Sequence, residues 1–199
     1  MRDDSSDVSE FDQWSRNYEK SWSQAFYFDP IHRAVLDLVA RRDGSSVPVT
    51  ILDIGCGTGR LLRKAGQHWP AAALVGVDPS QGMIEVASRL MPEATFHVAA
   101  AESLPLPDAS VDLAITTMSF HHWKDQAAGV REIARVLRPG GRFCLADATL
   151  PAWLARLIHH MEGNSFGAWR ALLESAGLSV AAQQRRFLGH ILLTLSVKH

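Results

Sequence analysis

The amino-acid sequence predicts an α/β fold with a mostly parallel sheet, and two parts of the chain support this prediction. From residue 49 to residue 147, apolar segments of strand length alternate with amphipathic segments of helical length. Parallel strands need a helical crossover, so this alternation predicts parallel pairing with helices on both faces of the sheet. The last two expected strands are linked only by Phe187, Leu188 and Gly189. That link is too short for a crossover helix, so the final pair must be antiparallel.

The N-terminal part is expected to be helical. Aromatic residues recur at helical spacing over 11–27, and apolar residues share one face of a second helix that follows Asp29 and Pro30. The aromatic residues are Phe11, Trp14, Tyr18, Trp22 and Phe26, and the apolar residues are Ile31, Val35, Leu38 and Val39. A loop over 43–46 leads to the alternating part.

The alternating part begins with a continuous apolar strand at 49–54. Further strands are expected at 73–77, 95–99, 111–117 and 142–147, and helices at 59–69, 80–91 and 125–137. Asp125 is a suitable N-cap for the last of these helices, and Pro139, Gly140 and Gly141 are expected to end it.

The C-terminal part is expected to hold two helices and the antiparallel strand pair. The helices are expected at 151–161 and at 166–176, the second with Ser165 as its N-cap and Gly177 after its last turn. The strands are expected at 178–185 and 190–197.

Length and composition indicate one domain. The chain has 199 residues, 47% of them hydrophobic, and this is ordinary for a single globular core. Residues 1–10 are acidic and serine-rich, which predicts a disordered tail rather than a targeting signal and leaves 11–199 as the domain. No apolar run approaches the ~20 residues needed to span a bilayer, so no membrane association is expected. The two cysteines, Cys56 and Cys144, have no metal or redox spacing, which predicts no metal site and a cytoplasmic location.

The charged residues do not indicate a nucleic-acid partner. The net charge is −1, which creates no overall attraction for a polyanion. Arg131, Arg135 and Arg138 are expected to form a basic stripe on one helix, and we interpret it as a solvated face paired with Glu132. RNA binding needs more convergent basic surface than this.

A glycine-rich turn follows the first expected strand and opens a helix. Its spacing is G-x-G-x-G, from Gly55 through Gly57 to Gly59, with Asp53 two residues before the first glycine. Glycines allow a tight turn and close approach of a ligand to the backbone. The dinucleotide fingerprint G-x-G-x-x-G needs a glycine where Arg60 stands, which disfavours a nicotinamide oxidoreductase. A carboxylate at Asp53 suits a ligand with an ammonium group better than a pyrophosphate.

The segment 53–59 resembles the signature loop of class I S-adenosylmethionine (SAM)-dependent methyltransferases, and three further segments agree with this family. Segment 76–80 ends the second strand with Asp78, segment 100–108 resembles the family's D-A-E-x-L-P-F-P-D, and 132–141 resembles its helix and turn before the fifth strand. The likeness covers about residues 11–147.

This resemblance implies a Rossmann-like three-layer sandwich with seven strands in the order 3-2-1-4-5-7-6, the last strand antiparallel. It implies SAM as cofactor, with the loop around its methionine end, Asp78 on the ribose hydroxyls and segment 100–108 against the adenine. The cofactor-binding residues implied in this way are Asp53, Gly55, Cys56, Gly57, Thr58, Gly59, Asp78, Pro79, Met83, Ala101, Glu102 and Thr117. Ala100 departs from the family, which usually has Asp there, so adenine recognition is expected from the Ala101 backbone and apolar packing by Met83.

Segment 117–123, after the fourth strand, is expected to line the acceptor cleft, because ligands bind beyond the carboxyl ends of strands at the switch point of an open parallel sheet. This chain lacks the D/N-P-P-Y/F motif of amino-group methyltransferases and any Pro-Cys pair, which favours a small-molecule acceptor. His121 and His122 are candidate general bases, although a His-His-Trp run is also common in the family as a packing feature. Tyr18 is a candidate lid residue, since relatives with a similar W-x-x-x-Y segment use it so, while packing of that helix on the core is the alternative.

Two functions stay open on the sequence alone. One is transfer of a methyl group from SAM to an O, N or C atom of a small molecule. The other is a catalytically inactive SAM-binding module, which Ala100 and a short lid at 151–163 would suit. Residues 11–45 are expected to form an N-terminal helical lid. The short lid at 151–163 implies an acceptor site that is shallow or completed by a second subunit, and the chain is expected to be a monomer or homodimer.

Overall fold

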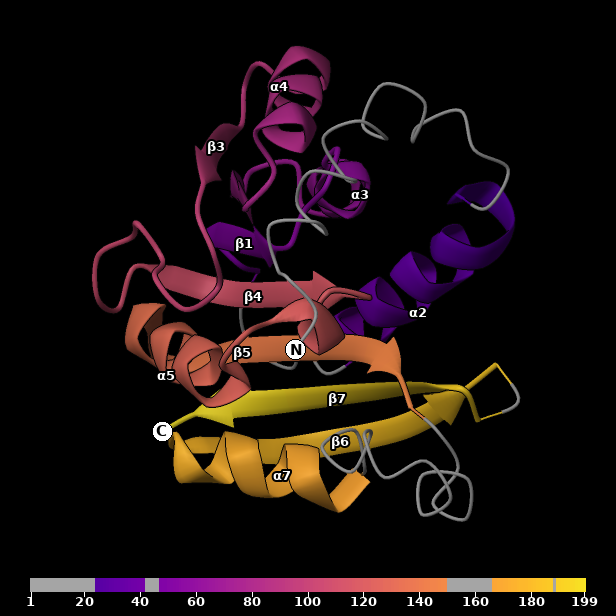
Figure 1. Cartoon of the computed structure of the whole chain (residues 1–199), viewed down its shortest axis with the longest axis vertical. Helices are drawn as coiled ribbons and strands as arrows, with labels where there is room; N and C mark the ends of the chain where they lie inside the picture. The colour runs from indigo at the N-terminus through magenta and orange to yellow at the C-terminus, as the bar shows by residue number, and fades with distance from the viewer. Residues whose placement is uncertain (1–23, 42–46, 150–165, 188) are drawn as a thin grey trace.

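The structure is a computed structural model that describes residues 24–41, 47–149, 166–187 and 189–199. Seven strands form one sheet (Figure 1). In spatial order the strands are β3 (Thr95–Val98), β2 (Ala73–Asp78), β1 (Thr50–Ile54), β4 (Val111–Thr117), β5 (Leu137–Ala148), β7 (Ile191–Lys198) and β6 (Leu178–Arg186). The pairs up to β5 are parallel, whereas β7 runs antiparallel to both β5 and β6. The predicted strand order and the antiparallel last strand are confirmed.

Helices cover both faces of this sheet. The described helices are η1 (Gln24–Phe28), α2 (Asp29–Ala40), α3 (Arg60–His68), α4 (Gln81–Leu90), η2 (Phe120–His122), α5 (Gln126–Val136) and α7 (Phe166–Ser175). One buried core lies between α2, α3 and the sheet, and a second lies between the sheet and α5 and α7. In β1, Ile51 belongs to the first core and Leu52 to the second, because successive side chains of a strand point to opposite faces.

Three of the features expected of the helices are found in the structure. The Asp125 carboxylate accepts the backbone N–H of Ala128 at 2.9 Å at the start of α5. Gly177 follows α7 with a φ of +81°, the left-handed conformation that favours glycine after a helix. The face of α2 formed by Ile31, Val35, Leu38 and Val39 is buried.

The expected boundary between the 125–137 helix and the 142–147 strand is wrong. Helix α5 ends at Val136, and β5 begins at once with Leu137, which pairs with Val111. The next pair in the register is Leu113 with Arg142, so the Pro-Gly-Gly segment forms an irregularity inside the strand pair, with φ of +78° at Gly140. Arg138 therefore lies on β5, not on the helix that carries Arg131 and Arg135.

Several expectations lie outside the described residues: the tail at 1–10, Tyr18 and most of the helix at 11–27, the loop at 43–46, Ser165 and the segment at 151–163. The described end of the first segment, Gln24–Phe28, is a π-helix. Phe26 is 77% exposed there, so this member of the aromatic stripe does not pack on the core. Over the described ranges, no helix has both the length and the apolar character needed to cross a membrane.

Candidate functional site

The candidate site lies at the edge of the sheet where β1, β2, β4 and β5 all end. The chain passes from β1 outward to β2 on one side, while β4 continues to β5 on the other. This reversal makes the boundary between the paired strands β1 and β4 the switch point of the sheet, and ligands of open α/β folds bind beyond the strand ends at such a point.

The glycine loop after β1 has the backbone that its composition predicts. Gly55, Gly57 and Gly59 have φ of +68°, +52° and +77°, values that side-chain-bearing residues adopt only under strain. The backbone N–H of Gly55 donates to Val77 O at 2.8 Å, which joins the loop to β2. A Cβ on Gly55 would collide with the side chain of Ser119, so the loop also packs closely on the segment after β4.

Gly57 faces open space. A Cβ built on this residue would have no atom of the described residues within 4 Å. Its N–H donates to Oδ2 of Asp78 at 2.8 Å, and the other carboxylate oxygen of Asp78 accepts the N–H of Ser80 at 2.9 Å. Asp78 is 9% exposed, and each oxygen of a carboxylate can accept more than one hydrogen bond. The arrangement therefore fits a ligand that presents hydroxyl groups beside the glycine loop.

Asp53 is a buried acid at this edge with a carboxylate oxygen that is unpaired in the described part of the chain. It is 2% exposed, and its Oδ2 has no hydrogen-bond partner among the described residues. Burial, and secondarily the charge of Asp78, raises the pKa of its carboxyl well above the usual value. A buried acceptor without a partner is costly, and a cationic group placed against it would relieve that cost.

The remaining loop residues contribute mainly through the backbone. Cys56 is buried, and burial together with the nearby carboxylates of Asp53 and Asp78 raises the pKa of its thiol, so it is protonated at neutral pH. Thr58 is 1% exposed, and its carbonyl accepts a hydrogen bond from Arg63 at 2.8 Å. Pro79 is exposed at the end of β2.

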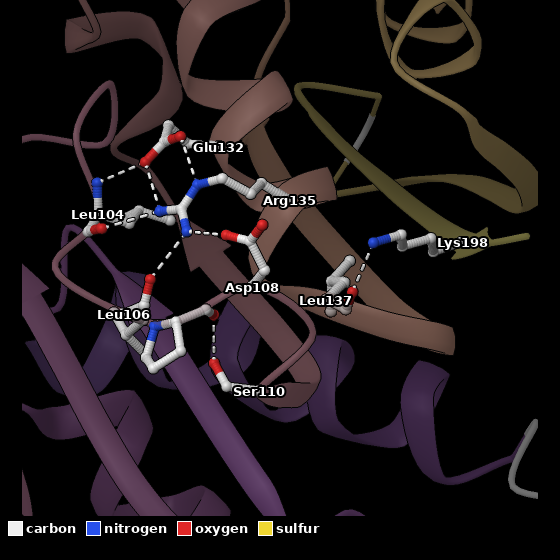
Figure 2. A network of polar contacts seen from close by, with 9 residues as sticks. Leu104, Leu106, Asp108, Ser110, Glu132, Arg135, Leu137 and Lys198 are labelled. Carbon is white, nitrogen blue, oxygen red and sulfur yellow. Dashed lines mark hydrogen bonds and ion pairs between the residues drawn. The ribbon is translucent and has the colours of Figure 1, made fainter.

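The segment expected against the adenine is held in place by α5. The Glu132 carboxylate accepts the N–H of Leu104 at 2.9 Å, and the Arg135 guanidinium donates to the carbonyls of Leu104 and Leu106 at 2.9 and 2.8 Å. Figure 2 shows Arg135 at the centre of this network, between Glu132 and Asp108. The Ser110 hydroxyl donates to the Pro107 carbonyl of the same loop. Nearby, the Lys198 ammonium donates to Leu137 O at 2.7 Å.

Ala101 and Met83 are 5% and 2% exposed, so both are available only as apolar packing surfaces or through their backbones. The Glu102 carboxylate accepts the N–H of Asp125 at 3.1 Å and thus faces the start of α5.

The segment after β4 is tied to the end of β1. The hydroxyl of Thr116 donates to Ile54 O at 2.7 Å. The Ser119 hydroxyl lies 3.2 Å from the Thr116 hydroxyl. The Trp123 indole N–H donates to the Ser119 hydroxyl at 3.0 Å. Thr117 is the last residue of β4, between Thr116 and Ser119 in the chain. Met118 has a φ of +52°. These bonds bring the segment that carries His121 beside the glycine loop.

His121 is paired with an acid that sequence reasoning missed. Its Nδ1 lies 2.7 Å from Oδ1 of Asp147, and its backbone N–H donates to Oδ2 at 3.0 Å. Asp147, the penultimate residue of β5, has a fully buried side chain, while 31% of the His121 side chain is exposed. The hydrogen bond to Asp147 raises the pKa of His121 above its ordinary value, against the opposing effect of burial. A signal was present in the sequence: Asp147 ends a strand at the same edge as Asp53 and Asp78.

The other two catalytic candidates differ in position. The ring of His122 lies 4.0 Å from that of His121, centroid to centroid, and His122 is exposed. Tyr18 lies outside the described residues. In the part of the chain that the structure describes, no group of three or more His, Cys, Asp or Glu side chains could hold a metal ion.

Comparison with known proteins points to one family. The sequence model described as a methyltransferase domain matches residues 52–145, which run from β1 into β5. The chain is 34% identical over 145 residues to YcgJ, an uncharacterized methyltransferase of Bacillus subtilis strain 168, covering 65% of this chain and 56% of YcgJ. It is 33% identical over 142 residues to YafE, an uncharacterized protein of Escherichia coli K12, covering 63% of this chain and 68% of YafE. The alignment thus spans little more than half the length of YcgJ.

A solved structure shares nearly the whole fold. It is the methyltransferase of Haloferax volcanii in complex with the Trm112 methyltransferase activator, with a TM-score of 0.77 over 96% of this chain and 98% of that chain. The sequences are 23% identical, so this similarity bears on the fold alone.

Proposed function

The chain belongs to the class I SAM-dependent methyltransferases, and from this premise we propose that it transfers a methyl group from SAM to an oxygen, nitrogen or carbon atom of a small molecule. The observation that carries the proposal is the buried Asp53 carboxylate oxygen that has no partner among the described residues, two residues before the glycine loop. SAM brings an ammonium group at its methionine end and two ribose hydroxyls. This pair of groups matches Asp53 and Asp78.

In this proposal each part of the site has one task. Asp53 receives the ammonium group, Asp78 the ribose hydroxyls, and Gly57 leaves room for the ligand beside the backbone. Met83 and Ala101 pack against the adenine in place of the polar contact that Ala100 cannot make. The bound cofactor supplies an electrophilic methyl group on a sulfonium, so the chain mainly has to orient the acceptor and exclude water.

The proposed acceptor is a small molecule, and no nucleic-acid partner is proposed. The segment after β4 has none of the motifs of base- or protein-amide methyltransferases, which supports a small molecule. We propose that the chain acts as a monomer or homodimer and without nucleic acid. Both cysteines are buried and neither forms a disulfide, which supports a reducing, cytoplasmic location.

Calorimetry tests the cofactor. S-Adenosylhomocysteine is titrated into the full chain, with NADH as the comparison ligand, and binding of the former alone is the expected result. Binding of NADH without S-adenosylhomocysteine would overturn the proposed function. Transfer is then followed with methyl-labelled SAM.

A further inference from the structure

The pairing of His121 with Asp147 is more than a turn cap. One buried carboxylate accepts both the ring Nδ1–H and the backbone N–H of the same histidine, at 2.7 and 3.0 Å. The backbone bond alone would fix the turn of η2. The ring bond adds a fixed orientation of the imidazole, and it comes from a different strand, β5.

This pairing also selects a tautomer. A carboxylate only accepts hydrogen bonds, so Nδ1 carries the proton and Nε2 of the neutral ring carries the lone pair. Nε2 makes no hydrogen bond to any described residue. The ring is only partly covered, with 31% of the side chain exposed.

The segment that carries His121 packs on the glycine loop. Ser119, two residues earlier, contacts Ile54 O at 3.4 Å and fills the space over Gly55. Among the described residues, the charged and titratable groups in contact with the ring are Asp147 from β5 and His122 from the same turn. Asp147 is the group that stabilises the ring's positive charge when it takes up a proton.

We propose that His121 is the general base of the reaction, that Asp147 is its positioning residue, and that the acceptor nucleophile is a hydroxyl group. This inference rests on the proposed function and narrows it. A carboxylate acceptor has already lost its proton, and a neutral amine attacks through its lone pair, so neither needs a base before attack. A hydroxyl must lose its proton as it reacts.

The hydroxyl oxygen attacks the methyl carbon and a C–O bond forms. The C–S bond breaks and its electron pair stays on sulfur. The hydroxyl proton passes to Nε2 of His121, and the imidazolium pairs with the Asp147 carboxylate until the proton leaves to solvent.

The first test needs no acceptor. ¹⁵N spectra of histidine-labelled full chain with S-adenosylhomocysteine give the tautomer and pKa of His121, whose signal is assigned by its loss in His121→Gln. We expect the Nδ1–H tautomer, a pKa above 6.5, and a downward shift of that pKa in Asp147→Asn. An Nε2–H tautomer, or the same titration in Asp147→Asn, would contradict the inference. The signal of His68, at the C-terminal end of α3, is the internal reference and should be the same in Asp147→Asn as in the wild-type chain.

The second test asks which nucleophile is used. Labelled SAM is incubated with panels of phenols and alcohols, anilines, and benzoates of matched shape. We expect transfer to hydroxyls only, a loss of about 10²–10⁴-fold in His121→Gln with unchanged S-adenosylhomocysteine affinity, and an unchanged rate in His68→Gln. In Asp147→Asn the acidic limb of the pH–rate profile should move with the pKa of His121.

Three outcomes count against the inference: preferred transfer to amines or carboxylates, an undiminished rate in His121→Gln, or no hydroxyl methylated while S-adenosylhomocysteine binds. Failure of the wild-type chain to bind S-adenosylhomocysteine contradicts the proposed function instead, so the two failures are distinguishable.

Discussion

Oδ2 of Asp78 accepts a 2.8 Å hydrogen bond from the backbone N–H of Gly57, which ties the end of β2 to the glycine loop after β1. The same carboxylate holds the N–H of Ser80 at the start of α4. Asp78 thus shapes the site and is also the proposed ribose acceptor, and these two roles need separate variants.

Asp78→Ala should weaken S-adenosylhomocysteine binding by about 1.5–3 kcal/mol, the scale of lost charge-assisted hydrogen bonds. Asp78→Asn keeps one carbonyl acceptor, so it should retain more thermal stability than Asp78→Ala while still binding poorly. Calorimetry and thermal unfolding of both variants measure the two effects. An unchanged dissociation constant in both would mean that the ribose lies elsewhere.

Asp53→Asn should change stability and affinity in opposite directions. Burial raises the pKa of Asp53, which means that the folded chain without ligand holds the ionised form at a cost. Removing the charge should therefore stabilise the ligand-free chain by roughly 1 kcal/mol or more. The ammonium group loses its counter-charge, so S-adenosylhomocysteine should bind more weakly. Urea titrations with and without ligand test this, and a variant that is less stable yet binds normally would refute it.

Local sequence patterns made the fold and the glycine loop predictable, whereas the pairing of His121 with Asp147 depends on a tertiary contact. The G-x-G-x-G turn and Asp78 are set by residues close in the chain. His121 and Asp147 are 26 residues apart, and only the pairing of β4 with β5 brings them together. The helix end was misjudged for the same reason: Pro139 and the glycines are typical of a helix stop, but Leu137 already pairs with Val111.

Arg135→Lys should destabilise the loop against the adenine. The guanidinium donates to Glu132, Asp108 and two backbone carbonyls, a fork that an ammonium cannot reproduce. We expect a loss of roughly 2 kcal/mol in the free energy of unfolding and weaker S-adenosylhomocysteine binding. Arg131→Lys is the matched control, because Arg131 is 64% exposed and lies 4.0 Å from Asp125. Equal effects of the two substitutions in urea titrations would show that the network is not needed.

Gly57→Ala separates backbone strain from loss of ligand space. Its φ of +52° costs an alanine about 1–2 kcal/mol, and the new methyl group enters the open space beside the loop. Gly140→Ala has similar strain, with φ of +78° and an equally open surround, but it lies in the β4–β5 irregularity. Both variants should lose similar stability, and only Gly57→Ala should lose affinity for S-adenosylhomocysteine in calorimetry. Equal affinities would remove Gly57 from the site.

His32 on α2 should make the chain less stable as the pH falls. It is 5% exposed, its Nδ1 has no partner among the described residues, and burial lowers its pKa to about 4 from an ordinary value of 6.5. A depressed pKa means that the folded state resists protonation. The stability from the neutral ring is therefore fully present above 6.5 and is lost as the pH falls toward 4, by about 3 kcal/mol in total. Asp29, whose pKa its bond to Arg60 lowers to about 2, loses its own contribution only below its ordinary 3.8, outside this window. In His32→Leu, urea titrations should show a free energy of unfolding that depends less steeply on pH between 6.5 and 4. A His32→Leu variant with the wild-type slope would mean that other groups cause the loss.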